Sequence, residues 1–342
     1  MMIKNVARIM GVLMAATISG AAAAGQPAPD KYPTVGSIVV LDPQLKQILS
    51  PAARIEQLAE GMQWGEGPVW IRQGGYLLFS DVPRDTVYKW KEGAGLTVHL
   101  KPEDFTKALH NAGRSGPNGL LLDSQRRLVV CLEGDRQLAR LEADGSFTSI
   151  AGYYKDRRLN SPNDAVYRRN GDLYFTDPPY GLEKKNEDPR KELVQNGVYR
   201  VTRGGEIQLL VKDLTFPNGI AFSPDEKTLY VAVSDPARPV IMAYEVKTDG
   251  TVANDREFFN ATELAKSGPG LPDGLKVDNK GNVFATGPGG VLVLSPKGKH
   301  LGTLVTGQAT ANCAWGDDGS VLYLTSGKTL SRVKTLSRGA GF

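Results

Sequence analysis

Six residues that carry side-chain oxygens stand at the same place in six similar stretches of the sequence. Each of these lead residues precedes a short apolar run, a turn rich in Gly or Asp and a second apolar run, and the six are Glu66, Asn118, Asn163, Asn218, Asp273 and Asn312. Carboxylate and carboxamide oxygens without His or Cys suit hard cations, so the set indicates Ca²⁺, with Mg²⁺, Mn²⁺ or Zn²⁺ as alternatives. Glu66 and Asp273 would offset the charge of one divalent ion, and Asn oxygens would fill the remaining positions.

The repeated stretches predict the elements that would bring these side chains together. Each has the pattern of a β-hairpin, because alternating apolar residues flank turn dipeptides such as Asp-Gly and Asn-Gly. The lead residues recur every 39 to 55 residues, and a repeat of about 40–50 residues with several short strands is typical of a propeller blade. We therefore expect an all-β protein, a six-bladed β-propeller. The first residue of each innermost strand would point toward the axis at one end of the central channel.

Each Asn-Gly or Asp-Gly pair also has a purely local interpretation. These are the commonest dipeptides of tight turns, so any one of them by itself is more often a turn than a ligand position. Six equivalent positions favour the ligand interpretation, because turn chemistry would also admit Ser or Gly there and would not favour Glu66.

The composition narrows the class of partner. The chain has 342 residues, of which 41% are hydrophobic and 23% charged, as in ordinary soluble globular proteins. Its formal net charge of +4 falls to +2 without Lys4 and Arg8, the charged residues of the first 24. A nearly neutral chain without a Lys/Arg cluster has no electrostatic footprint for nucleic acid, so nucleic acid is not an expected partner.

The N-terminus has the layout of a secretory signal. Basic residues precede an apolar stretch over 9–18, which is followed by small residues ending at Ala24. The apolar stretch is too short to span a bilayer, although an uncleaved anchor is the alternative. We expect a signal peptide over 1–24, a flexible leader over 25–36 and a catalytic propeller over 37–342. The mature protein would be exported, periplasmic or secreted, without a membrane anchor.

The propeller makes specific predictions for the ends of the chain and for the two cysteines. A strand at 37–41 or at 54–58 should pair with the C-terminal hairpin at 321–324 and 330–333 and so close the ring. Cys131 and Cys313 belong to the second and sixth repeats, which are not neighbours in a six-membered ring, so we expect two buried free thiols. Cys313 should pack between blades.

Two insertions interrupt the hairpins. Residues 101–116, which include His110, lie just before a lead residue and are a candidate gate over the channel, or else a solvent-exposed linker. Residues 178–196 begin near Tyr180, which could reach the site, and continue in a charged run over 183–192 that we expect to be a solvated face. The three His residues lack ligand-like spacing and the G-x-S-x-G motif is absent, so no nucleophile motif competes with the cation site.

Five short motifs in fixed order carry a resemblance to a known family. They are EGPVW (66–70), SPND (161–164), DPPYGL (177–182), FPNG (216–219) and PDG (272–274). Together they resemble the gluconolactonase family that includes regucalcin, roughly over residues 54 to 334. The resemblance implies a six-bladed propeller that hydrolyses sugar lactones with one divalent metal in its channel. It implies the metal ligands Glu66, Asn163, Asn218 and Asp273.

The resemblance also implies further roles. Asp273 would be the general base as well as a ligand, and Asn118 matches an additional channel Asn of bacterial members. The substrate-binding Arg of regucalcin falls near Ser161, where this chain has none. Asn118, Asn163 and Tyr180 are the expected substrate-binding residues, and a small lactone is the expected substrate.

Two rival functions remain open from the sequence. The scaffold and metal also resemble those of diisopropyl fluorophosphatase, which would make the chain a phosphotriesterase-like hydrolase. A non-catalytic propeller, stabilised by calcium and binding a partner at its rim, is the alternative from another class. The sequence predicts neither the lactone nor the oligomeric state.

Overall fold

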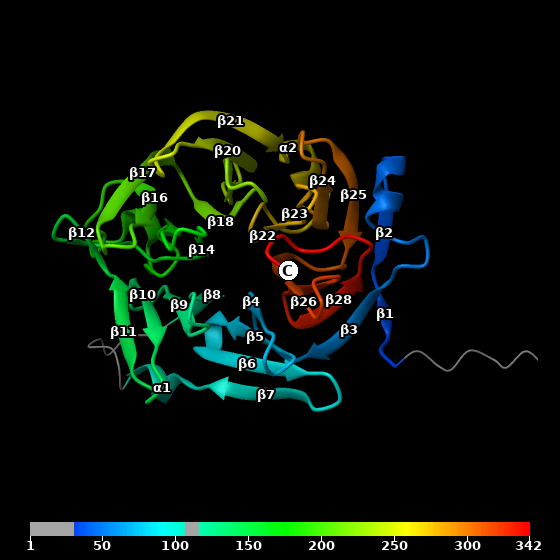
Figure 1. Cartoon of the computed structure of the whole chain (residues 1–342), viewed down its shortest axis with the longest axis horizontal. Coiled ribbons are helices and arrows are strands. Elements are labelled where there is room, and N and C mark those ends of the chain that lie inside the picture. The colour runs from blue at the N-terminus through cyan, green and yellow to red at the C-terminus, as the bar shows by residue number, and fades with distance from the viewer. Residues whose placement is uncertain (1–30, 107–115) are drawn as a thin grey trace, which may run out of the picture. The chain divides into compact units, whose positions relative to one another are not determined.

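The hairpins expected from the alternating apolar runs are present throughout residues 31–106 and 116–342, the part of the chain that the computed structural model describes. Within the unit Tyr32–Phe342, six sheets of four or five antiparallel strands surround a common centre (Figure 1). This arrangement confirms the all-β, six-bladed β-propeller. The expected signal peptide, the first half of the leader, and residues 107–115 of the candidate gate, His110 included, lie outside the described residues. In the described part of the chain no helix has the length and apolar character needed to cross a membrane.

Four blades consist of four consecutive strands each, and Figure 1 shows the first strand of each blade innermost. They are β4 (Gly65–Ile71), β5 (Tyr76–Asp81), β6 (Thr86–Lys91) and β7 (Gly95–Leu100) in blade one, and β8 (Pro117–Leu122), β9 (Leu128–Leu132), β10 (Gln137–Leu141) and β11 (Phe147–Ala151) in blade two. Blade three has β14 (Ala165–Tyr167), β15 (Leu173–Asp177), β16 (Asn196–Val201) and β17 (Ile207–Leu214), and blade four has β18 (Pro217–Phe222), β19 (Thr228–Val233), β20 (Val240–Val246) and β21 (Val252–Asn260).

The last two blades take strands from the beginning of the chain. Blade five has β22 (Leu275–Val277), β23 (Val283–Gly287), β24 (Gly290–Leu294) and β25 (His300–Val305), to which β2 (Ser37–Val40) adds. Blade six has β26 (Thr310–Gly316), β27 (Val321–Ser326) and β28 (Thr329–Lys334), followed by β3 (Ile55–Glu60) and β1 (Thr34–Val35). The pairing of β3 with β28 confirms ring closure by the second of the two candidate segments, 54–58, whereas the first, 37–41, pairs with β25 instead. Arg332 reinforces it by an ion pair with Glu56 at 2.8 Å.

Short elements occupy the connections. They are the α-helices α1 (Pro102–Thr106) and α2 (Thr262–Ala265), the 3₁₀ turns η1 (Pro43–Gln47), η2 (Val82–Arg84) and η3 (Lys185–Glu187), and the two-stranded ribbon of β12 (Tyr153–Tyr154) and β13 (Arg157–Arg158). The insertion over 178–196 joins β15 to β16 and contains η3, so it interrupts blade three as expected.

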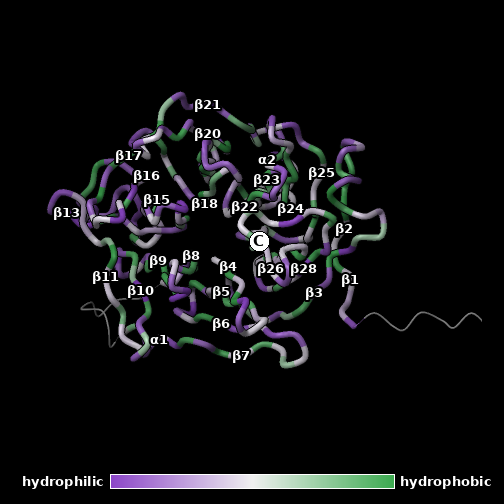
Figure 2. The backbone as a smooth tube through the Cα atoms, in the orientation of Figure 1, coloured by the Kyte–Doolittle hydropathy of each residue, from purple (hydrophilic) through white to green (hydrophobic). Residues whose placement is uncertain are grey.

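The hydrophobic core lies between the blades. Six buried clusters each combine side chains of two neighbouring sheets, as in the cluster that joins Phe284 of blade five to Trp315 of blade six. Figure 2 shows hydrophobic stretches along the strands and hydrophilic turns between them around the ring. Cys131 and Cys313 are buried free thiols, as predicted. The Cys313 thiol lies 3.6 Å from the carbonyl of Phe284, so it packs between blades as expected.

The glycines after the lead residues serve the contact between blades. A Cβ on Gly119 would lie 2.6 Å from the carbonyl oxygen of Asn163, and one on Gly219 would lie 2.2 Å from that of Asp273. Both glycines lie inside strands β8 and β18. The tight-turn interpretation of these Asn-Gly pairs is therefore wrong, because the neighbouring inner strand passes too close for any side chain. The same close approach brings successive lead residues together.

Candidate active site

The lead residues of five blades line one cavity of about 430 Å³. They are Glu66, Asn118, Asn163, Asn218 and Asp273, and Tyr180 lines the same cavity. All residues expected to bind the cation or the substrate are thus brought together, although up to 207 positions separate them in the sequence. The cavity is assembled from the inner ends of different sheets, which is why no local motif could form it alone.

Asn312, the sixth lead residue, departs from this pattern. It is 2% exposed and does not line the cavity; its Nδ2 donates to Glu66 Oε2 at 3.3 Å. Its Oδ1 accepts the backbone N–H of Cys313 at 2.8 Å. Strand β26 begins two residues earlier, and Thr310 takes the place at the cavity wall. The expectation that six side chains converge is therefore met by five, and Asn312 holds Glu66 in place.

Three buried oxygens of the cavity have no hydrogen-bond partner among the described residues. They are Asn118 Oδ1, Asn218 Oδ1 and Asp273 Oδ1, which belong to three different blades. An unsatisfied buried acceptor costs a protein about 1–3 kcal/mol. A divalent cation would satisfy all three, because each is a hard oxygen ligand without a competing donor. The residues present therefore fit an oxygen-coordinated cation.

The amide nitrogens of the same residues are engaged on the protein side. Asn218 Nδ2 donates to Ser234 Oγ at 2.9 Å. Asn118 Nδ2 and Asn163 Nδ2 both donate to Glu133 Oε1, each at 2.9 Å. Because the nitrogens are held in this way, the amide oxygens of Asn118 and Asn218 remain available to a ligand.

Burial sets the proton affinity of the two carboxylates. The pKa of Glu66 is raised to about 7, chiefly because the side chain is removed from water, and the carboxylate of Glu133 adds to the effect. Burial and then the negative charge of Glu66 raise the pKa of Asp273 well above its usual range. Both groups would bind a cation in exchange for protons. Within residues 31–106 and 116–342, no group of three or more His, Cys, Asp and Glu forms a metal site, so amide oxygens would have to complete the coordination.

Tyr180 forms one wall of the cavity. Its ring stacks on that of Phe216, with centroids 5.8 Å apart and planes inclined by 19°. Ser161 is fully buried and holds the segment before and after Tyr180. Its Oγ donates to the carbonyl of Pro178 at 2.5 Å and accepts the N–H of Gly181 at 2.8 Å.

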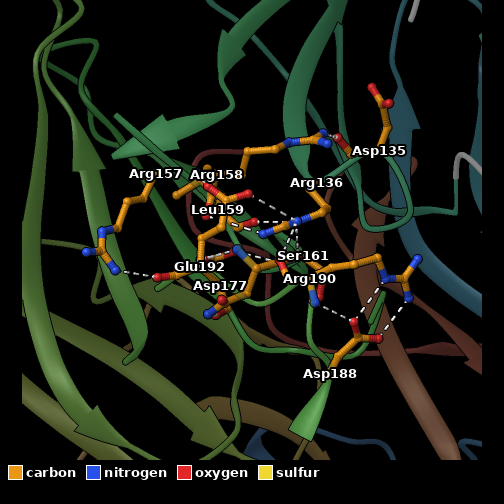
Figure 3. Close-up of polar contacts among 11 residues, drawn as sticks. Asp135, Arg136, Arg157, Arg158, Leu159, Ser161, Asp177, Asp188, Arg190 and Glu192 are labelled. Atoms are coloured by element: carbon orange, nitrogen blue, oxygen red, sulfur yellow. Dashed lines mark hydrogen bonds and ion pairs between the residues drawn. The ribbon is translucent and has the colours of Figure 1, made fainter. Parts of the chain in front are cut away.

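The start of the insertion is tied to the segment that carries Asn163. Asp177 accepts the backbone N–H groups of Asn160 and Ser161, both at 2.8 Å, and Figure 3 shows Ser161 and Asp177 within this polar cluster. The charged run over 183–192 is mostly exposed, as expected for a solvated face. Two residues depart from that expectation: Asp188 is buried against Arg190, and Lys185 lines the cavity.

Several residues of the cavity wall were missed by the sequence analysis. Glu133 follows β9, Ser234 follows β19, and Trp64 precedes Glu66. None of them occupies a lead position, so the repeat gives no signal for Glu133 or Ser234. Trp64 supports Glu66 directly, since its Nε1 donates to Glu66 Oε1 at 3.3 Å.

Residues 64–328 match the family described as the SMP-30/Gluconolactonase/LRE-like region. The chain belongs to this family. A gluconolactonase from Zymomonas mobilis is 36% identical over 97% of this family member and 95% of its own length. A regucalcin from Oryctolagus cuniculus is 25% identical over 82% of the chain and 89% of its own length. Among solved structures, a gluconolactonase from Xanthomonas campestris superposes with a TM-score of 0.78 at 32% identity, covering 91% of this family member and 98% of the other chain.

Proposed function

We propose that the protein is a divalent-cation-dependent lactonase that opens a sugar lactone in the cavity lined by the five lead residues. The three unpartnered acceptors Asn118 Oδ1, Asn218 Oδ1 and Asp273 Oδ1 carry this proposal. The similarity to gluconolactonases over nearly the whole chain supports the class of reaction. Glu66, Asn163, Asn218 and Asp273 would hold the cation together with Asn118 Oδ1, and Ca²⁺ suits their oxygens best.

The chain's own residues would perform the proton transfers. A bound cation would supply Lewis-acid polarisation of the lactone carbonyl. Asp273 would accept a proton from the attacking water. The water oxygen forms a bond to the carbonyl carbon while the ring ester C–O bond breaks. The proton passes to the departing ring oxygen, and the product is an open-chain hydroxy acid.

The remaining wall would bind the substrate. The stacked rings of Tyr180 and Phe216 offer a flat apolar surface to one face of a sugar ring. Asn118 and Asn163 would accept or donate hydrogen bonds at its hydroxyl groups. Lys185 at the same cavity would attract the carboxylate that forms on ring opening.

Proton release from D-glucono-1,5-lactone tests this function. The purified chain is stripped with a chelator and assayed with Ca²⁺, Mg²⁺, Mn²⁺ or Zn²⁺ added back, in parallel with a phosphotriester. Turnover of the lactone that disappears with the chelator and returns with a cation is the expected result. If neither substrate is turned over while a cation still raises the melting temperature, the protein is a cation-stabilised binding propeller instead. Turnover of the phosphotriester alone would make it a phosphotriesterase.

We further propose that the protein is exported. Support comes from the sequence of residues 1–24, with basic residues, an apolar stretch and small residues in the order of a secretory signal. Mass spectrometry of the protein recovered from its native cell should find a chain that begins near Gly25. A chain that retains residues 1–24 would contradict cleavage, and recovery of the protein from the cytoplasmic fraction alone would contradict export.

A further inference from the structure

Glu133 joins two blades through one carboxylate oxygen. It follows β9, is 6% exposed and lines the cavity. Its Oε1 accepts Asn118 Nδ2 from blade two and Asn163 Nδ2 from the start of blade three, both at 2.9 Å. The lead residues of neighbouring blades are therefore held by a common acceptor that is not itself a lead residue.

This contact decides which way the two amides face. An ionised carboxylate only accepts hydrogen bonds, so it selects the nitrogen of each amide and turns the oxygen away from itself. Asn118 Oδ1 is accordingly left buried in the cavity wall, without a partner in residues 31–106 and 116–342. Without this acceptor either amide could rotate and present N–H groups, which repel a cation.

The backbone around Glu133 is rigidly held. Its N–H donates to the carbonyl of Gly116 at 2.9 Å, and the following turn ends at Arg136, whose N–H donates to the Glu133 carbonyl at 3.2 Å. Arg136 is 7% exposed, and its Nε donates to the carbonyl of Leu159 at 2.7 Å. Figure 3 shows this guanidinium beside Leu159 and Ser161, in the segment that leads to Asn163. The turn that carries Glu133 and the segment that carries Asn163 thus form one unit.

We propose that Glu133 is a positioning residue that directs the amide oxygens of Asn118 and Asn163 toward the cation and so sets the affinity of the site. The inference rests on the cation dependence of the proposed function and assigns a further residue to it. Hydrogen-bond partners of metal ligands typically change metal affinity by about 10–100-fold when they are removed. The effect of Glu133 should pass through Asn118 and Asn163 and not through its charge alone.

A double-mutant cycle measured by calorimetric titration of Ca²⁺ into the metal-stripped protein tests the inference. Glu133→Leu, which removes the acceptor, should weaken Ca²⁺ binding about 10–100-fold. Glu133→Gln keeps an oxygen that can accept both amides and should retain most of the affinity. In the Asn118→Ala background, Glu133→Leu should weaken binding several-fold less than in the unsubstituted protein. Glu183→Gln, which removes an exposed carboxylate, is the matched charge control and should leave the affinity unchanged.

Two results overturn the inference while leaving the proposed function intact. One is an equal loss for Glu133→Gln and Glu133→Leu, and the other is a loss for Glu133→Leu that is the same with and without Asn118. Circular dichroism establishes that each variant is folded. If Glu133→Leu does not fold, Glu133→Ser replaces it in the double-mutant cycle. An unsubstituted protein that binds none of the four cations overturns the cation dependence and this inference together.

Discussion

Replacing Glu66 by Gln should stabilise the protein when divalent cations are removed. Glu66 is 4% exposed, and its pKa is raised from 4.5 to about 7, chiefly by burial. One pKa unit corresponds to about 1.4 kcal/mol, so the ionised side chain lowers the free energy of unfolding by about 3 kcal/mol. A raised pKa means that the folded chain keeps a proton which the unfolded chain releases. Below pH 4.5 the side chain is protonated in both states and costs no stability. As the pH rises to about 7, the free energy of unfolding falls by the full amount.

Urea unfolding in a chelator at pH 5 and pH 8 measures the effect. At pH 8 the free energy of unfolding of Glu66→Gln should be about 3 kcal/mol higher than that of the unsubstituted protein. At pH 5 the two free energies should be similar. Saturating Ca²⁺ should reverse the order, because a ligand that binds only the folded state stabilises it. Glu183→Gln, at an exposed position, should show no such pH dependence. Equal stability of Glu66→Gln and the unsubstituted protein at pH 8 in chelator would refute the reasoning.

Three other substitutions test separate parts of the site. Asp273→Asn should lower kcat on D-glucono-1,5-lactone at least a hundredfold and leave the circular dichroism spectrum unchanged; activity close to the unsubstituted level would remove Asp273 from the mechanism. Ser161→Ala removes both hydrogen bonds that hold the Tyr180 segment, so KM should rise several-fold with a smaller change in kcat. Ser149→Ala, at an exposed position, is the control. An unchanged KM in Ser161→Ala would contradict the role of the Tyr180 wall. Gly219→Ala should lower the free energy of unfolding by about 1–3 kcal/mol, because its Cβ would lie 2.2 Å from the carbonyl oxygen of Asp273. Gly204→Ala, whose Cβ would meet nothing nearer than 3.7 Å, should leave the stability unchanged. Equal melting temperatures for these two variants would refute the close-approach argument.

The propeller could be predicted because the same hairpin pattern recurs six times in the sequence. Alternating apolar residues determine each hairpin, the similarity of the hairpins determines their stacking, and stacking leaves only a ring in which equivalent positions face one another. Pairing of an N-terminal strand with the last hairpin followed from the same logic, since an open ring would leave a strand edge exposed, but the sequence left open whether 37–41 or 54–58 would supply it. Even Cys313 could be placed, because its position beside a lead residue fixes the face of the strand on which it lies.

The parts that could not be predicted depend on contacts between blades. Glu133 belongs to no repeated position, and only the distance between β9 and the neighbouring inner strands makes it an acceptor for two amides. Asn312 has the right residue type, but its Nδ2 donates to Glu66 and its Oδ1 accepts the N–H of Cys313, so its side chain does not line the cavity. The strands' own patterns also say nothing of how closely the inner strands approach, which is why Gly119 and Gly219 were open to interpretation as turn residues.

The pairing of β3 with β28 joins the segment before blade one to the last hairpin and so closes the ring around the cavity. Glu56 and its partner Arg332 are separated by 276 positions in the sequence, so their ion pair forms only when both ends of the propeller are present. Glu66 of blade one and Asp273 of blade five line the same cavity, with blade six between them in the ring. The cavity therefore needs the complete ring, and we expect a chain truncated before its final hairpin to lack the Ca²⁺ binding proposed above.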